Sequence, residues 1–332
     1  MLKRNNYNLL ANNTFGIQAN ADCFIEYDSV EELKALLPDL QDTPLLHIGG
    51  GSNLLFTGDF HGTVLHSRIK GVGEVDRTDS HVLVKVGAAE VWDEFVATAV
   101  NNGWYGIENL SLIPGETGAA AVQNIGAYGV EVKDVVDSVH AMDLTTGEIR
   151  IFSNEDCHYA YRHSIFKAEL KGRYAILFVV LRLALRFEPK LEYGNIRQAL
   201  DGHEPTAQNI RNAIIDIRNQ KLPDPKQTGN AGSFFMNPVV SHSKYEELKA
   251  LYPDMPAYVM DHGVKIPAGW LIEQSGWKGK ALGRAAVHDK QALVLVNLGG
   301  ATADEIVALS EAVRKAVELK FGIEISPEVN FI

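Results

Sequence analysis

The stretch IPGETGAAAVQNIGAYG, from Ile113 to Gly129, decides how this chain is interpreted. Glycines and alanines surround Pro114, Gln123 and Asn124, and such small residues let the backbone approach a flat or extended ligand closely. The side-chain amides of Gln123 and Asn124 can hydrogen-bond the polar edge of that ligand. The same pattern also suits a tightly packed turn and bulge, so the segment alone leaves a purely structural role open.

A second glycine-rich segment, GGGSN, runs from Gly49 to Asn53 directly after the apolar run LLHI. Consecutive glycines allow a positive φ and turn successive N–H groups towards one point, which forms a nest for a phosphate. The spacing matches neither G-x-G-x-x-G nor the P-loop, so a Rossmann or P-loop site is not expected. A lone glycine-rich turn is more often structural, but two such loops in one domain favour a dinucleotide ligand.

The chain around these loops predicts an α+β domain. Short β-rich runs separated by glycines extend from Leu45 to Gly129, with one amphipathic stretch from Val91 to Asn101. A second β-rich region covers residues 132–152. The apolar run from Tyr174 to Phe187 contains two arginines and is too short for a membrane helix, so it predicts one or two buried strands.

The second half of the chain predicts a separate, smaller domain. Apolar residues recur at helical spacing from Thr206 to Gln220, and the prolines of KLPDPK end that helix, so we place a boundary at Lys221. Helices are expected near Tyr245 and Trp270, and a strand over Ala292–Val296. A long final helix follows, with Thr302 and Glu305 forming a capping box.

Composition excludes several classes of protein. The chain has 332 residues, 46% hydrophobic and 22% charged, which indicates a folded protein of about two domains. Its net charge of −11 argues against a protein that mainly coats nucleic acid or anionic membrane. Residues 150–226 nevertheless carry more Lys and Arg than Asp and Glu, which indicates either a solvated surface or a cleft that attracts phosphorylated ligands.

The cysteine content and the N-terminal region both favour a cytoplasmic protein. Cys23 and Cys157 are too few for a disulfide framework and lack metal-ligand spacing, so free thiols are expected. Asn and Tyr interrupt the N-terminal region before it forms an apolar stretch long enough for a signal peptide. A cytoplasmic protein is the expectation.

Three isolated residues are candidates for chemistry. Arg162, in YRHSIFK, is a permanently charged donor suited to a carboxylate, or a surface residue. Ser233, in GNAGSFFMNP, lacks the G-x-S-x-G elbow of serine hydrolases; it is either a turn serine or a weak acid able to protonate a strongly basic carbanion or enolate. Glu328, in SPEVNFI, is either a surface charge or a buried carboxyl group.

Eight motifs in this order resemble one family across nearly the whole chain. They are GGGSN, IPGETGAAAVQNIGAYG, YRHSIFK, KLPDPK, GNAGSFF, AGWLIEQSG, AAVHDKQALVLVN and PEVNFI. The family is that of the UDP-N-acetylenolpyruvoylglucosamine reductases of peptidoglycan synthesis. Each motif alone is weak evidence for the family, but all eight in this order are specific to it.

The resemblance implies an α+β fold whose FAD-binding domain is similar to those of vanillyl-alcohol oxidase and p-cresol methylhydroxylase (PCMH), followed by a smaller α/β substrate-binding domain. The expected FAD-binding domain covers residues 1–190, in two lobes of about 1–70 and 71–190. Residues 191–220 are expected to connect it to the substrate domain, 221–325, and residues 326–332 to form a tail returning to the active site. FAD would be held without a covalent bond by Gly49, Gly50, Gly51, Ser52, Asn53, Pro114, Gly115, Gly118, Gln123, Asn124, Gly126 and Tyr128.

The resemblance also implies the reaction. NADPH would reduce FAD, and the enolpyruvyl ether of UDP-N-acetylglucosamine-enolpyruvate would then be reduced to UDP-N-acetylmuramate. Arg162 and Glu328 would act at the substrate carboxylate, and Ser233 would protonate the adjacent carbon. The expected substrate contacts are Tyr193, Arg218, Lys221, Asn237 and Gln291, with Tyr193 marking a subclass that has an extra segment.

Two positions depart from the pattern of the family. Met236 stands where relatives often carry Lys, and Asn330 where many carry Arg. The loss of two positive charges predicts altered affinity for the diphosphate or NADPH and an unaltered reaction.

Two other functions are compatible with parts of the sequence. One is a flavin oxidase of the same fold acting on a small alcohol, in which GNAGSFF and PEVNFI would have no evident use. The other is a nucleotide-sugar-binding regulator with an inactive site, which the presence of Ser233, Arg162 and Glu328 disfavours. We expect a monomer whose partners are its small-molecule substrate and NADPH, with no resident metal and no nucleic-acid or membrane partner.

Overall fold

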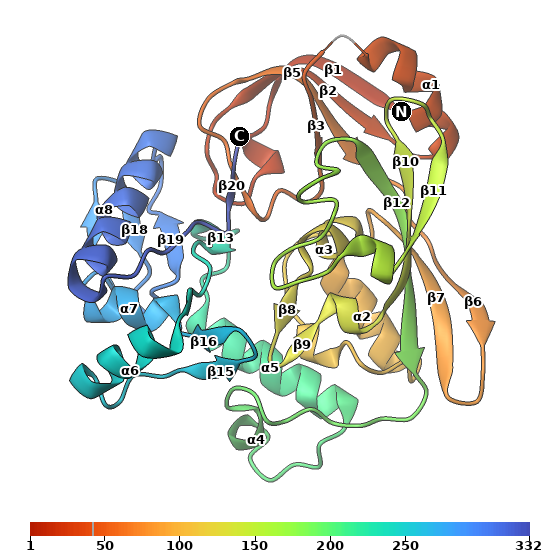
Figure 1. The fold of residues 1–332 in the computed structure, drawn as a ribbon. Coiled ribbons are helices and arrows are strands. Elements are labelled where there is room, and N and C mark those ends of the chain that lie inside the picture. The colour runs from red at the N-terminus through yellow and green to blue at the C-terminus, as the bar shows by residue number, and fades with distance from the viewer. Residues whose placement is uncertain (42) are drawn as a thin grey trace. The chain divides into compact units, whose positions relative to one another are not determined.

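The computed structural model describes residues 1–41 and 43–332, and these pack into two compact units (Figure 1). The first unit consists of residues 1–7, 21–50 and 60–220, and the second of residues 8–20, 51–59 and 221–332. The division at 220/221 lies at the boundary chosen from the sequence. Three segments differ from the predicted bounds. Residues 8–20 and 51–59 pack with the second unit instead of the first, and residues 191–220 pack with the first unit.

The first unit contains a four-stranded sheet, and its strand order is β1 (Leu2–Asn8), β2 (Asn20–Tyr27), β5 (Phe60–Ser67), β3 (Leu45–Ile48). Strands β2 and β3 both pair parallel to β5. Helix α1 (Val30–Leu40) begins at Ser29, whose hydroxyl accepts the N–H of Glu32, and it buries four leucines against this sheet. The glycine-rich segment begins directly after β3, so the end of this edge strand positions its first residues.

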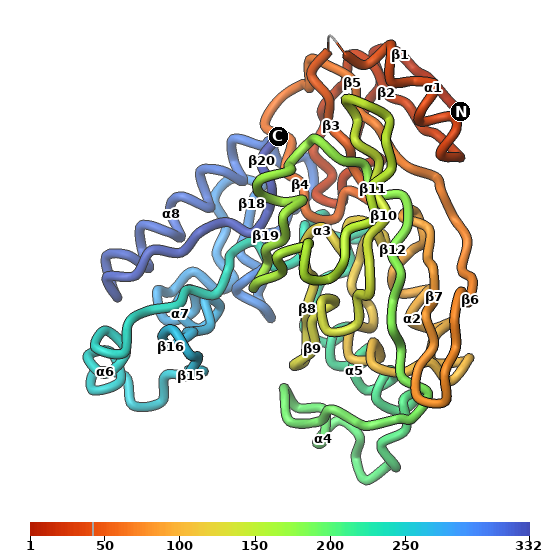
Figure 2. The backbone as a smooth tube through the Cα atoms, turned by 45° about the vertical axis from the view of Figure 1, so that its right-hand side comes forward, coloured from red at the N-terminus to blue at the C-terminus, as the bar shows by residue number. Residues whose placement is uncertain are grey.

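A five-stranded antiparallel sheet is the second sheet of the first unit. Its order is β11 (Ile149–Ser153), β10 (Val136–Asp143), β12 (Tyr174–Ala184), β7 (His81–Gly87), β6 (Val72–Arg77). The expected apolar run is thus one central strand, β12, between β10 and β7 (Figure 2). Its buried side chains pack with those of helices α2 (Trp92–Asn101) and α3 (Thr117–Gln123). A two-stranded ribbon, β8 (Gly126–Ala127) and β9 (Val130–Glu131), follows α3.

Helix α5 (Ala207–Lys221) fits the predicted range closely, and the short α4 (Ile196–Ala199) precedes it. Ile210, Ile214 and Ile217 lie on its buried face. Arg211, on the same helix, forms a two-point ion pair with Asp93 of α2, at 2.5 and 3.0 Å. Burial acts to raise the pKa of Asp93, but Arg211 and the Leu112 N–H outweigh it and hold that pKa below its usual value. The ion pair therefore fixes α5 against α2.

The second unit is built on small sheets covered by helices. One sheet has the order β13 (Gly229–Ser233), β19 (Val294–Asn297), β18 (Ala285–Val287), β17 (Ala281–Leu282), and another the order β14 (Val239–Val240), β16 (Gly263–Lys265), β15 (Tyr258–Met260). The tail strand β20 (Asn330–Phe331) pairs parallel to β4 (Leu54–Leu55). The helices are α6 (His242–Leu251), α7 (Ala268–Gln274) and α8 (Ala303–Phe321).

Helix α8 illustrates how the sequence produces this unit. Thr302 and Glu305 form the predicted capping box, with the Glu305 N–H donating to Thr302 Oγ1 and the Thr302 N–H donating to Glu305 Oε2. Its buried apolar residues recur at intervals of three or four, so one face enters the core. That core also contains Phe15, Ile17 and Leu55. Residues far apart in sequence therefore complete the second unit.

Candidate active site

The two glycine-rich segments meet in the first unit. A Cβ on Gly49 would lie 3.1 Å from Glu116 Oε2, and one on Gly50 would lie 3.6 Å from the Cα of Gly115. Gly115 has φ of +116°, a conformation that suits glycine. Gly118 lies equally close to its surroundings, since a Cβ there would be 2.9 Å from that of Ala88. At Gly50 and Gly115 the two segments therefore meet without an intervening side chain. Such bare backbone is of the kind that lets a dinucleotide such as FAD approach closely.

The remaining residues of GGGSN pack in the second unit. Gly51, with φ of +64°, accepts the Thr14 N–H through its carbonyl. Asn53 Nδ2 donates to the Glu328 carbonyl at 3.3 Å, and the Asn330 N–H donates to the Asn53 carbonyl at 3.1 Å. The five residues predicted to form one nest are thus shared between the units, Gly49 and Gly50 in the first and Gly51, Ser52 and Asn53 in the second.

Asn124 is a structural centre of its loop. It ends α3 in the left-handed conformation and is fully buried. Its Nδ2 donates to Glu131 and to the Ala160 carbonyl, and its Oδ1 accepts the Lys133 N–H. Every polar atom of the side chain is therefore bound within the unit, so a contact of Asn124 with a ligand would have to use its backbone. Pro114 is exposed, and Gln123, the last residue of α3, is partly exposed.

Arg162 lies against the second glycine-rich segment. Its Nη2 donates to the Gly126 carbonyl at 2.9 Å, and its Nη1 donates to the Asn124 carbonyl at 3.4 Å. Its backbone has φ of +55°, which is uncommon for a residue with a side chain. The structure thus brings together the predicted carboxylate-binding arginine and the predicted FAD loop.

Gly126 leads to a testable prediction. A Cβ at this position would lie 2.8 Å from Glu131 Cγ and 3.2 Å from Arg162 Nη1. Gly126→Val is expected to weaken FAD binding at least about tenfold, because the loop and the guanidinium must both shift. FAD titration of the apoprotein measures this, with Gly73→Val as the control, since Gly73 has open space around it. Full FAD occupancy of purified Gly126→Val would count against this loop.

Two predicted tyrosines lie beside the same loop. A Cβ on Gly194 would lie 3.0 Å from the Tyr128 ring, and one on Gly129 would lie 3.2 Å from Tyr193 Cβ. The charge of Arg218 of α5 also acts on the Tyr128 hydroxyl. Burial raises the pKa of the Tyr128 hydroxyl despite that arginine, and burial lowers the pKa of Arg218. Since Arg218 Nε is buried without a hydrogen-bond partner in the described residues, this side chain retains a donor for a ligand.

In the second unit, Ser233 and Glu328 lie on adjacent backbone segments. The Glu328 N–H donates to the Phe234 carbonyl at 2.8 Å, and the Met236 N–H donates to the Ser326 carbonyl at 2.9 Å. The tail thus runs antiparallel beside the residues that follow Ser233. Phe234 is fully buried, whereas Ser233 and Glu328 are partly exposed. The backbone hydrogen bonds therefore fix the segment that carries Glu328 beside the segment that carries Ser233.

Three further predicted substrate contacts belong to the second unit. Asn237 Oδ1 accepts the Ala268 N–H at the start of α7, at 2.9 Å. Gln291 lies at the same helix, because a Cβ on Gly269 would be 3.1 Å from its Oε1. Lys221 ends α5 and is exposed. Asn237 and Gln291 are therefore brought together at α7.

Sequence reasoning did not single out several residues that hold these loops. Thr14 donates its hydroxyl to the Asn230 carbonyl at 2.6 Å, and the Asn230 N–H donates to the Thr14 carbonyl. His66 binds Glu116, the neighbour of Gly49. No local spacing relates residues 14 and 230 or 66 and 116. The residue type at position 229 is the one sequence feature that relates to the contact of residues 14 and 230. Position 229 is a glycine, and a Cβ there would lie 2.3 Å from the Phe15 carbonyl oxygen.

The described residues contain no cluster of three His, Cys, Asp or Glu side chains placed to hold a metal ion. Within the same ranges, 1–41 and 43–332, no helix combines the length and apolarity needed to cross a membrane. Cys23 and Cys157 are free thiols, and burial raises the pKa of Cys157 to about 11, which keeps it protonated and unreactive.

Comparison with known proteins defines the class. Residues 21–153 match the FAD binding domain family, and residues 224–332 match the family described as UDP-N-acetylenolpyruvoylglucosamine reductase, C-terminal domain. The fold and the glycine-lined loops are those of an FAD-dependent oxidoreductase. The crystal structure of the reductase MurB from Thermus caldophilus has the same fold, with a TM-score of 0.69 at 22% identity, covering 99% of this chain and 98% of that one.

The particular family follows from full-length relatives. The chain is 56% identical to a UDP-N-acetylenolpyruvoylglucosamine reductase of Bacteroides fragilis over 98% of its own length and 99% of that protein. It is 51% identical to the enzyme of the same name from Porphyromonas gingivalis, over 99% of both chains. The chain belongs to the UDP-N-acetylenolpyruvoylglucosamine reductase family. Its cofactors are FAD and, as the hydride donor, NADPH.

Proposed function

We propose that this chain uses NADPH to reduce the enolpyruvyl ether of UDP-N-acetylglucosamine-enolpyruvate to UDP-N-acetylmuramate, a step of peptidoglycan synthesis. The observation that carries the assignment of residues is the pairing of the tail with the segment after Ser233, through the Glu328 N–H and the Phe234 carbonyl. This pairing supports a hydroxyl and a carboxylate acting on one substrate group. When bound, FAD supplies the hydride chemistry.

Ser233 is proposed to donate the proton that completes the reduction. Hydride addition to the methylene carbon leaves negative charge on the carbon next to the carboxylate, and this enolate is basic enough to take a proton from a hydroxyl. The proton goes from Ser233 Oγ to that carbon, which leaves the lactyl ether. The buried Phe234 and Phe235 follow Ser233 directly and limit how far its backbone can move.

Arg162 and Glu328 are proposed to act on the substrate carboxylate. A guanidinium held by two carbonyls, at Asn124 and Gly126, is already oriented before charge develops on the enolate. Glu328 contributes by a shared hydrogen bond with the carboxyl group, since two bare carboxylates would repel each other. Arg162 belongs to the first unit and Glu328 to the second, so the two roles are separate proposals.

The glycine-lined segments are proposed to hold FAD, through the residues predicted from the sequence. In the first unit these are Gly49, Gly50, Pro114, Gly115, Gly118, Gln123, Asn124, Gly126 and Tyr128, and in the second Gly51, Ser52 and Asn53. The proposed substrate contacts are Tyr193 and Arg218 in the first unit and Lys221, Asn237 and Gln291 in the second. We also propose a cytoplasmic monomer that binds neither nucleic acid nor membrane, which sedimentation at several protein concentrations and a nucleic-acid and vesicle binding assay would test.

The absorbance of the flavoprotein under anaerobic conditions tests the reaction. NADPH is expected to bleach the absorbance, and only the enolpyruvyl substrate is expected to restore it. Recovery with oxygen alone would indicate an oxidase, and an apoprotein that cannot take up FAD would contradict the proposal.

Met236 provides a prediction about affinity. Its backbone N–H is bound by Ser326, but its partly exposed side chain carries no charge. Met236→Lys is expected to tighten binding of NADPH or of the substrate about two- to fivefold, the effect of one partly screened ion pair. Titrations of both ligands measure it, with Met260→Lys as the control, since Met260 is an exposed methionine of β15. Unchanged affinity for both ligands would show that the missing charge has no effect.

A further inference from the structure

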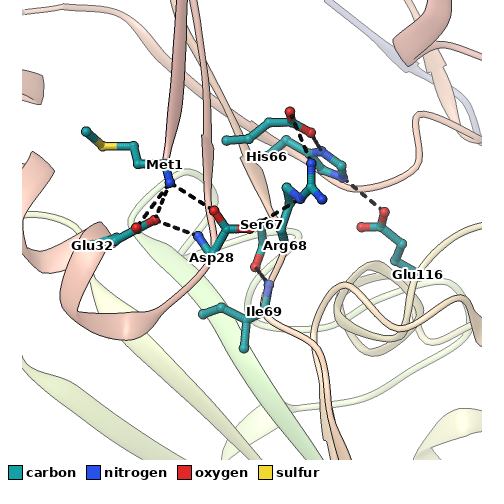
Figure 3. Close-up of polar contacts among 9 residues, drawn as sticks. Met1, Asp28, Glu32, His66, Ser67, Arg68, Ile69 and Glu116 are labelled. Carbon is teal, nitrogen blue, oxygen red and sulfur yellow. Dashed lines mark hydrogen bonds and ion pairs between the residues drawn. The ribbon is translucent and has the colours of Figure 1, made fainter.

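His66 lies between two carboxylates in the first unit. Its Nδ1 is 3.1 Å from Glu26 Oε1. Its Nε2 is 3.0 Å from Glu116 Oε1, and Figure 3 draws this contact as a dashed line. The side chains come from β5, β2 and the residue before α3, and each is less than one-fifth exposed. Both ring nitrogens face an acceptor, which favours the doubly protonated imidazolium.

The other titratable groups around His66 do not neutralise the negative charge of Glu26 and Glu116. Tyr27 is buried, and burial raises the pKa of its hydroxyl, which is 2.7 Å from His47 Nε2. Burial, followed by the charge of His66, lowers the pKa of His47 to about 4, so His47 is neutral. Arg68 Nη1 is 3.7 Å from Glu26 Oε2, on a side chain that is 56% exposed. The imidazolium of His66 is therefore the main positive charge facing Glu116.

Glu116 connects this cluster to the glycine-rich segment. One carboxylate oxygen binds His66, and the other lies 3.1 Å from the Cβ position of Gly49. The Glu116 Cγ lies 3.9 Å from the Cβ position of Gly50. His66 therefore binds one oxygen of the Glu116 carboxylate while the other oxygen lies beside Gly49.

We propose that His66 is a positioning residue for FAD binding: it fixes the Glu116 carboxylate beside Gly49 and Gly50 and neutralises its charge there. This rests on the proposed role of Gly49, Gly50 and Gly115 in holding FAD. The diphosphate of FAD is anionic, so an uncompensated carboxylate next to its loop would repel it. Removing one partner of a partly buried pair leaves such a charge behind.

The affinity of the apoprotein for FAD is expected to decrease as the pH increases. Burial acts to lower the pKa of His66, but Glu116 and Glu26 outweigh it, and the pKa is raised above its ordinary value of about 6.5. The imidazolium is present below that raised pKa and is lost as the pH increases through it. FAD affinity of the apoprotein is therefore expected to fall roughly tenfold between about pH 6 and pH 9, a change equivalent to one pKa unit.

Titration of the apoprotein with FAD, followed by the quenching of flavin fluorescence from pH 6 to pH 9, tests this without any turnover. His66→Gln is expected to bind FAD roughly tenfold more weakly at pH 6 and to lose the pH dependence. The double variant with Glu116→Gln removes the carboxylate as well, so its affinity is expected to recover. His61→Gln is the control, because His61 makes an exposed contact with Asp22 on the same pair of strands.

Gly50→Val and His66→Gln together distinguish an error in the FAD-binding loop from an error in the role of His66. Gly50→Val should weaken FAD binding if the loop holds the cofactor; if it does not, the assignment of the loop fails. If Gly50→Val weakens binding but His66→Gln behaves like His61→Gln, or the double variant does not recover, the role of His66 alone is wrong. Should His66→Gln fail to fold, Glu116→Gln alone decides, since at pH 9 it should bind FAD more tightly than the wild type, and equal or weaker binding would overturn the proposal.

Discussion

Gly51→Ala is expected to destabilise the second unit by at least about 3 kcal/mol. A Cβ at this position would lie 1.9 Å from the Asn12 carbonyl oxygen and 2.7 Å from its carbon, which are backbone atoms that no rotamer change can move. The residue also has φ of +64°, where a side chain is strained. The segment that contains Asn12 must therefore separate from the turn, and the core residues Phe15 and Ile17 leave with it.

Urea unfolding of the purified variant measures this effect. Gly58→Ala is the matched control, because Gly58 belongs to the same short segment, is exposed and has open space around it. That control is expected to be neutral or slightly stabilising, since alanine reduces the freedom of the unfolded chain. Equal unfolding midpoints for the two variants would contradict the close approach of residues 12 and 51.

Ser233→Ala is expected to slow reduction of the enolpyruvyl substrate at least about 100-fold, the range seen when a positioned proton donor is lost. The rate at which NADPH is oxidised should remain nearly normal, because no proton is transferred to the substrate in that half-reaction. The side chain is small and partly exposed, so the fold is expected to tolerate the change.

Stopped-flow absorbance measures the two half-reactions separately. Ser275→Ala is the control, since that hydroxyl donates to the Leu271 carbonyl and has no proposed chemistry. Ser233→Cys keeps a dissociable proton and should recover part of the lost rate. An equal loss in both half-reactions would exclude the proton-donor role.

Periodic features of the sequence predicted the regular structure well. The helix expected over residues 206–220 is α5 (Ala207–Lys221), and the amphipathic stretch ending at Asn101 is α2. The apolar run from Tyr174 became one strand, and the expected strand at Ala292 begins two residues later, at Val294. These features follow from burial along a single element, which leaves a pattern that can be read locally.

Contacts between distant segments left no comparable pattern. The bonds between Thr14 and Asn230 use mainly backbone atoms, and their partners are set by the path of the chain. The hydrogen bonds of the Asn124 side chain to Glu131, Ala160 and Lys133 also join residues with no characteristic spacing. Likewise, His66 and Glu116 have no fixed spacing, and only the folded sheet brings them together.

The second unit cannot be inherited or folded as one continuous piece of the chain. The chain passes between the two units five times, and the second unit needs residues 8–20 and 51–59 as well as residues 221–332. An isolated fragment of residues 224–332 would lack Phe15, Ile17 and Leu55 from its core and would leave β20 without its partner β4. Exchange of this unit between relatives by a single crossover would therefore separate pieces that fold together. Recombination can preserve it only if three segments are inherited jointly, and its folding must wait for contacts of high sequence separation.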